Sequence, residues 1–119
     1  MSKAGTRKLF GTDGIRGIAG EPPLDARTIY ATGLALGHSL RGKAERKVLL
    51  GRDTRESSPW ISSTVAAALR ETGASVESAG VVPTPAVAFL ARTHGFDAGV
   101  VISASHNPWR DNGIKLFGP

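Results

Sequence analysis

Residues 98–117 read AGVVISASHNPWRDNGIKLF, and this stretch decides the fold because an apolar strand in it runs straight into a polar loop. The five small or apolar residues 98–102 predict a buried β-strand. The polar loop 103–108 follows without a spacer. Asp-Asn-Gly at 111–113 predicts a turn, and residues 114–117 predict a short returning strand. The stretch therefore predicts a strand whose carboxyl end presents polar side chains.

Upstream of this stretch, helices and strands are predicted to alternate. Three helices are indicated by apolar residues at helical spacing, and in the second and third a proline follows the capping residue. The predicted amino-terminal caps are Asp25, Ser58 and Thr84. Strands are predicted at 47–50 and 75–81, and Gly73 and Gly95 are predicted to end the second and third helices. This order predicts an α/β fold, a three-layer α/β/α sandwich with a mainly parallel sheet.

The carboxyl edge of that sheet is the predicted place of the functional site. In open α/β sheets, ligands bind outside the carboxyl ends of the strands. Three polar loops are predicted to meet there, at 51–55, 82–85 and 103–107, and the glycine-rich segment 10–17 is expected to join them. Ser105 is therefore predicted to lie where such a sheet carries its chemistry.

The composition is that of an ordinary globular chain. The 119 residues are 40% hydrophobic and 21% charged, which is enough for one domain with a real core. The absence of cysteine excludes disulfides and thiolate metal ligands. No apolar run approaches the roughly 18 residues that span a bilayer, and the basic amino terminus has no apolar signal core. A cytoplasmic protein without a membrane partner is expected.

The charge of the chain favours an anionic partner. Its net charge is +5, from 15 Lys and Arg against 10 Asp and Glu. The basic residues are scattered, and the seven aromatic residues do not alternate with them as a platform for stacked bases requires. We therefore expect a phosphorylated small molecule as the partner, and no nucleic acid.

Three kinds of chemistry compete for Ser105. A hydrolase needs a histidine that faces the serine, but the adjacent His106 projects to the other side of an extended segment, and no Gly-x-Ser-x-Gly elbow is present. A metal site is not indicated, because the three histidines lack ligand spacing and the acidic residues do not cluster. Phosphate chemistry uses more residues, since a phosphoserine needs cations around it. Four are available near the predicted edge, namely Arg16, Arg52, Arg110 and Lys115.

Three blocks of the sequence resemble a known family. Residues 103–108, Ser-Ala-Ser-His-Asn-Pro, followed by Asp-Asn-Gly-Ile-Lys at 111–115, resemble the phosphoserine loop of the α-D-phosphohexomutases. Residues 8–17, Lys-Leu-Phe-Gly-Thr-Asp-Gly-Ile-Arg-Gly, look like the amino-terminal signature of one branch, the bacterial phosphoglucosamine mutases. Gly-Arg-Asp-Thr-Arg at 51–55 is similar to a third family block, in the family order. The resemblance covers essentially the whole chain.

The resemblance implies a mechanism. Ser105 would carry a phosphoryl group, donate it to a hexose monophosphate and take back the phosphate from the other end of the sugar. Mg²⁺ would bind the Ser105 phosphate, with its remaining ligands expected downstream of this chain. Lys115 and Arg16 would lie near the transferring group, with Lys115 able to serve as a base if its pKa is lowered, and His106 would position groups or handle protons. The implied phosphate-binding residues are Asn107, Arg110 and Arg52.

The resemblance also sets an expectation for the extent of the protein. Family members have three further domains, so residues 1–119 are expected to form the first domain, incomplete at its carboxyl end and inactive by itself. The full-length parent is expected to interconvert glucosamine 6-phosphate and glucosamine 1-phosphate, through hexosamine mono- and bisphosphates, and an open sheet edge would allow homo-oligomers. Two alternatives stay open: a phosphomannomutase or phosphoglucomutase, and a non-catalytic phosphate-binding or interaction module.

Overall fold

The computed structural model describes residues 14–40, 46–104 and 107–118, and this part of the chain forms one mixed sheet with helices on both of its faces. In chain order, the elements are β1 (Ile15–Ile18), α2 (Ala26–Ser39), β2 (Lys47–Arg52), α3 (Ser58–Glu71), β3 (Ser75–Val81), α4 (Thr84–Thr93), β4 (Ala98–Ile102) and β5 (Asp111–Phe117). No helix of these residues is long and apolar enough to cross a membrane.

The sheet has the strand order β1-β5-β4-β2-β3. Strand β2 pairs in parallel with both β3 and β4, whereas β5 lies antiparallel to β4 and to β1. Because β5 is reversed relative to both neighbours, β1 points in the same direction as β2, β3 and β4. The predicted α/β sandwich with a mainly parallel sheet is confirmed, with β5 as the single reversed strand of the described sheet.

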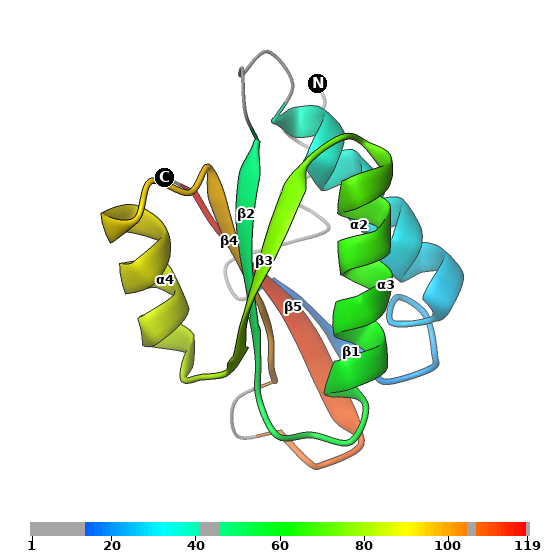
Figure 1. The fold of residues 1–119 in the computed structure, drawn as a ribbon. Helices are drawn as coiled ribbons and strands as arrows, with labels where there is room; N and C mark the ends of the chain where they lie inside the picture. The colour runs from blue at the N-terminus through cyan, green and yellow to red at the C-terminus, as the bar shows by residue number, and fades with distance from the viewer. Residues whose placement is uncertain (1–13, 41–45, 105–106, 119) are drawn as a thin grey trace.

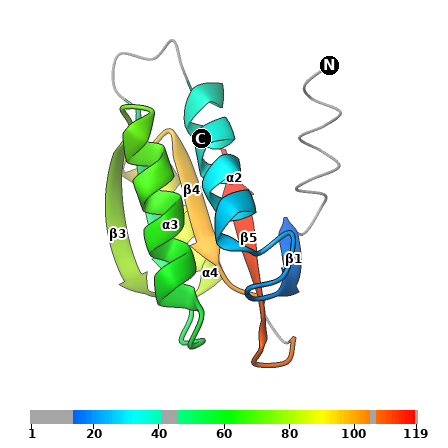
Figure 2. The same ribbon diagram turned by 90° about the vertical axis from the view of Figure 1, so that its right-hand side faces the viewer.

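Two hydrophobic cores hold the three layers together. Helices α2 and α3 lie on one face of the sheet and α4 lies on the other (Figures 1 and 2). The larger core joins α2 and α3 to the sheet through residues such as Ile29, Leu69 and Val100, all fully buried. The smaller core joins α4 to the opposite face through Val87 and Val101. Burial of apolar side chains on both faces is what makes β4 apolar throughout.

Two of the three predicted helix caps are wrong. Asp25 caps α2 as predicted, because its Oδ2 accepts a hydrogen bond from the Thr28 N–H at 3.2 Å. The predictions for Ser58 and Thr84 are wrong by one residue: both are the first residue of their helices, and neither helix has a side-chain cap. Ser58 is fully buried, and its hydroxyl donates to the Asp53 carboxylate at 2.6 Å. The Ser58 hydroxyl therefore binds Asp53 and does not form the helix cap that the sequence predicted.

The structure also differs from the prediction at a turn and at one strand. Residues 111–113 are not a turn but the beginning of β5, where they pair with β1. Asn112 is fully buried there, so its side chain serves tertiary contacts and not a turn. Strand β1 itself was not predicted: residues 10–17 were expected to form a glycine-rich segment beside the polar loops, but residues 15–18 pair with β5 as a strand. The predicted helix ends are confirmed, since Gly73 and Gly95 have φ values of 93° and 74° directly after their helices.

The packing of α2 on α3 makes a testable prediction at Gly33. A Cβ at this position would lie 2.6 Å from the Cβ of Ala68, so Gly33→Ala should lower the free energy of unfolding by about 1–3 kcal/mol, despite the better helix propensity of alanine. In an Ala68→Gly background the contact with Ala68 is absent and only the 3.2 Å approach to the Val65 carbonyl oxygen remains, so the same change should cost clearly less stability. Denaturant unfolding of the four proteins measures both effects. An equal effect of Gly33→Ala in the two backgrounds would contradict the packing.

Candidate functional site

The carboxyl ends of the three parallel strands lie side by side, as predicted. The Asp53 N–H, just after β2, donates to the Ile102 carbonyl at the end of β4 at 3.0 Å. The Val82 N–H, just after β3, donates to the carbonyl of Arg52 at 3.2 Å. Arg52 is the last residue of β2 and is half-buried. The loops that follow β2, β3 and β4 therefore meet at one edge of the sheet.

The loop after β4 begins with two buried residues. Ser103 donates its backbone N–H to the Gly113 carbonyl at 2.9 Å, and Ala104 is fully buried. Ser105 and His106 lie outside the described residues, so their predicted roles stay predictions. On the far side of this pair, the Asn107 N–H donates to the Ala104 carbonyl at 3.1 Å. The residues that flank Ser105 and His106 are therefore fixed at the carboxyl end of β4.

Arg16 lies beside this loop because a glycine leaves room for it. Arg16 of β1 pairs with Gly113 of β5. A Cβ at Gly113 would lie 2.9 Å from the Ser103 carbonyl oxygen and 3.2 Å from Cγ of Arg16, so only glycine lets these groups converge. The Nε of Arg16 is buried and has no hydrogen-bond partner among the described residues. A buried donor without a partner is costly and is expected to meet an acceptor.

Lys115 lies on the same face of the sheet as Arg16. Their neighbours Ile15 and Ile114 point into the core under α2 and α3, and alternate residues of a strand point to opposite faces. Lys115 pairs with Val101, which belongs to the core under α4. Arg16 and Lys115 therefore both lie on the α4 face, two residues out of register on adjacent strands. The structure brings together these two predicted cations.

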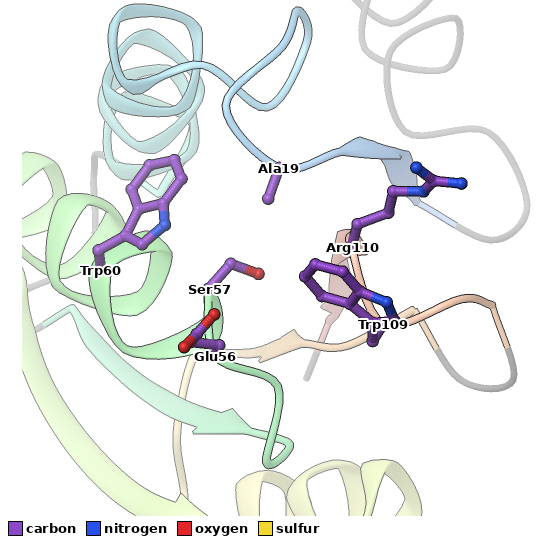
Figure 3. Close-up of a pocket in the computed structure, with 6 residues that line it drawn as sticks. All are labelled: Ala19, Glu56, Ser57, Trp60, Trp109 and Arg110. Atoms are coloured by element: carbon purple, nitrogen blue, oxygen red, sulfur yellow. The ribbon is translucent and has the colours of Figure 1, made fainter.

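Two other predicted site residues, Arg110 and Asn107, line surface hollows that those two cations do not line. Arg110 is exposed and lines a hollow of about 430 Å³ in which Trp60 and Trp109 lie on opposite sides (Figure 3). Asn107 lines a neighbouring hollow of about 580 Å³, where its side-chain amide donates to the Asp111 carboxylate at 3.3 Å. Trp109 lines both hollows. The phosphate-binding roles of Asn107 and Arg110 stay predictions.

The sequence did not predict the partly buried polar network around Asp53. Nε of Arg55 contacts Asp53 Oδ2 at 2.8 Å, and Ser58 Oγ donates to Asp53 Oδ1 at 2.6 Å. Ser58 Oγ in turn accepts from the side-chain amide of Asn112 at 2.9 Å, and Ser57 Oγ accepts from it at 2.8 Å. The only sequence signal was the Asp-x-Arg spacing, because Asp53 Oδ1 accepts from the Arg55 N–H two residues on.

The environment of Asp53 keeps its carboxylate charged. Burial alone would raise the pKa of Asp53, but hydrogen bonds from Ser58, from the backbone and side chain of Arg55, and from Ser103 together lower this pKa below its ordinary value of 3.8. Asp53 is therefore an anion that is already satisfied by its neighbours.

The described residues do not by themselves fit a magnesium ion. Among them, no three His, Asp or Glu side chains lie close enough together to hold a metal. Of the carboxylates beside the loop after β4, Asp53 is occupied by Arg55 and Ser58, and Asp111 accepts from the Asn107 amide. A hard cation needs several free oxygen ligands, and these residues offer none in a cluster.

The described elements define an α/β/α domain whose polar loops meet at the carboxyl edge of a mainly parallel sheet. Residues 7–119 match the family model described as "Phosphoglucomutase/phosphomannomutase, alpha/beta/alpha domain I", and the chain belongs to this family.

Relatives identify the branch of the family that the chain resembles. The chain is 62% identical over 113 residues to the phosphoglucosamine mutase of Koribacter versatilis and 57% identical over 113 residues to that of Solibacter usitatus. Each alignment covers 94% of this chain but only 24% and 25% of the relative, so the chain spans about a quarter of their length. The predicted resemblance to phosphoglucosamine mutases is confirmed.

A solved structure supports the same assignment. A phosphoglucomutase/phosphomannomutase family protein from Burkholderia thailandensis superposes on the chain with a TM-score of 0.79 at 34% identity. The match covers 92% of this chain and 26% of that protein. The fold described above is therefore the fold of this family's first domain.

The close approach at Gly113 makes a prediction about stability. Gly113→Ala would place a methyl group 2.8 Å from the Ile15 carbonyl oxygen, so we expect the free energy of unfolding to fall by about 1–3 kcal/mol. Gly118→Ala is the matched control, because a Cβ there meets no atom within 4 Å. Denaturant unfolding compares the two variants. Equal stability of both would contradict the geometry at Gly113.

The lowered pKa of Asp53 predicts how stability depends on pH. A carboxylate whose pKa is lower in the folded state stabilises the fold above its unfolded pKa, near pH 4, and this contribution is lost as the pH falls through the folded value. The stability difference between wild type and Asp53→Asn should therefore be largest at pH 5–7 and should shrink below about pH 4. Glu77→Gln, a change on the exposed edge strand, is the control. A difference that grows on acidification would refute the network.

Proposed function

We propose that this chain is the phosphoserine-carrying domain of a phosphoglucosamine mutase, which interconverts glucosamine 6-phosphate and glucosamine 1-phosphate. The observation that carries the proposal is the convergence of Arg16, Gly113 and the Ser103 carbonyl beside the loop that continues into Ser105. The names of the relatives support the choice of an amino sugar, and the +5 charge of the chain suits an anionic substrate.

The proposed reaction consists of two transfers that share one nucleophile. In the first, the bond between phosphorus and Ser105 Oγ breaks, and a bond forms between phosphorus and the free hydroxyl oxygen of the hexosamine monophosphate. The hydroxyl proton passes to a base, and Ser105 Oγ takes up a proton. The product is a hexosamine bisphosphate. In the second, the bond between phosphorus and the oxygen at the other end of the sugar breaks, and the phosphoryl group returns to Ser105 Oγ. The Ser105 proton passes through a base to that sugar oxygen, and the isomeric monophosphate leaves.

Arg16 and Lys115 are the residues of this chain that would act on the transferring group. Phosphoryl transfer depends mainly on positioning and on stabilisation of charge spread over the phosphoryl oxygens. The buried Nε of Arg16, which lacks a partner among the described residues, is a donor that a phosphoryl oxygen would satisfy. Lys115 lies on the same face and would hold or accept a proton there. His106 would position groups in the same loop.

The proposal predicts the behaviour of the full-length protein that carries this domain. Its kcat/KM should be highest for glucosamine phosphate among the glucosamine, glucose and mannose monophosphates. Ser105→Ala should abolish turnover because the phosphoryl carrier is gone, whereas Ser63→Ala, a serine on the exposed face of α3, should leave it unchanged. Residues 1–119 alone should show no mutase turnover, because positioning of the substrate lowers the barrier by several kcal/mol and this domain by itself would not supply it.

Coupled assays of the three sugar phosphates measure these expectations. A clear preference for mannose phosphate or glucose phosphate would replace the proposed substrate with that of a phosphomannomutase or phosphoglucomutase. Full activity of Ser105→Ala would refute the proposed role of the serine. No turnover on any of the three sugars, with the protein folded, would favour a non-catalytic binding module.

A further inference from the structure

We propose that Arg55 is a positioning residue that fixes the loop between β4 and β5 in the geometry that phosphoryl transfer requires. The proposal rests on the function proposed above, since it gives Arg55 a part in the same reaction. Arg55 would not touch the substrate. It would act through the backbone of the loop that carries Ser105.

The guanidinium group of Arg55 joins three carbonyls of that loop. Its Nη1 donates to the carbonyl oxygens of Asn107 at 3.0 Å, Pro108 at 2.7 Å and Asp111 at 3.2 Å. Because Nη1 carries only two hydrogens, these three acceptors share them. In the sequence, these carbonyls precede and follow the exposed Trp109. One nitrogen of Arg55 therefore binds the parts of the loop before and after Trp109. The Arg55 side chain is only 11% exposed, and its bonds to Asn107 and Asp111 are partly buried, whereas the bond to Pro108 is exposed.

Arg55 is itself held by a rigid partner. Its Nε contacts Asp53 at 2.8 Å, and Asp53 is fixed by Ser58 at the start of α3. The Asp53 N–H is bonded to the carbonyl of Ile102, the last residue of β4. The guanidinium is therefore anchored to the same strand end from which the loop departs.

The other described bonds of the loop are local or lie at its two ends, where Ser103 bonds to Gly113 and the Ala19 N–H donates to the Arg110 carbonyl at 3.0 Å. The Asn107 N–H bonds to Ala104, and the Asp111 N–H bonds to Pro108. Among the hydrogen bonds of the described residues, those from Arg55 are the ones that tie residues 107 and 108 to another part of the domain. Loss of Arg55 would leave that section of the loop with local bonds only.

The contacts need the shape of arginine as well as its charge. A guanidinium presents donors in a planar fork, so Nε and Nη1 serve Asp53 and the loop at the same time. A lysine at position 55 keeps the charge but has one nitrogen, which cannot serve both. Arg55→Lys therefore removes the bridge with little change in net charge.

The test uses the full-length protein with Arg55→Lys, and Arg70→Lys on an exposed part of α3 as the matched control. Because a small displacement of reacting groups costs up to about 100-fold in rate, we expect kcat of Arg55→Lys to fall by about 10- to 100-fold with KM changed by less than about threefold. Amide hydrogen exchange of the peptide 104–111 should become faster in Arg55→Lys, with exchange in α2 unchanged. Arg70→Lys should match wild type in every measurement.

A second variant keeps the proposal testable if lysine finds another partner. In Arg55→Ala, millimolar guanidinium should partly restore kcat, whereas the same concentration of sodium chloride should not. Unchanged exchange in the loop, unchanged kcat, or a loss of kcat that only follows the loss of folded protein would each overturn the proposal. A wild-type protein without mutase turnover would refute the proposed function instead, and hydrogen exchange would then decide by itself whether Arg55 holds the loop.

Discussion

The ion pair between Asp53 and Arg55 is the interaction on which the arrangement of the site depends. The two residues follow β2, yet their partners lie on α3, at the end of β4 and in the loop between β4 and β5. An exposed ion pair contributes little to stability. This pair is largely enclosed, and the hydrogen bonds around Asp53 lower its pKa. Together with the Asp53 N–H, it links α3, the end of β4 and the loop between β4 and β5.

The second constraint is steric and lies on the neighbouring strands. Gly113 lets β1 and the Ser103 carbonyl approach the same point of β5, which brings Arg16 beside the loop that continues into Ser105. Phe117 of β5 packs against the core under α4, whereas Lys115 lies on the same face of the sheet further along β5. The fold thus places Arg16 and Lys115, from β1 and β5, on one side of the loop. Arg55, which follows β2, binds the backbone of the loop from the other side.

The sequence predicted most of the architecture because the apolar patterns of β2, β4 and the helices are strong. It failed where tertiary contacts override local signals. Ser58 resembles a helix cap but bonds to Asp53, and Asn112 resembles a turn residue but is buried in β5. Arg55 was noticed only as part of a polar loop and of a family block, because its three carbonyl partners lie more than 50 residues away and no local pattern encodes them.

The central claim is that the loop after β4 carries the phosphoryl group on Ser105. The most direct test is phosphopeptide mapping of the full-length protein after incubation with a phosphorus-labelled hexosamine phosphate, followed by a chase with unlabelled substrate. The account predicts label on Ser105 that the chase removes at a rate comparable with turnover. Label confined to Ser103 or to another residue, or label on Ser105 that the chase does not remove, would contradict it.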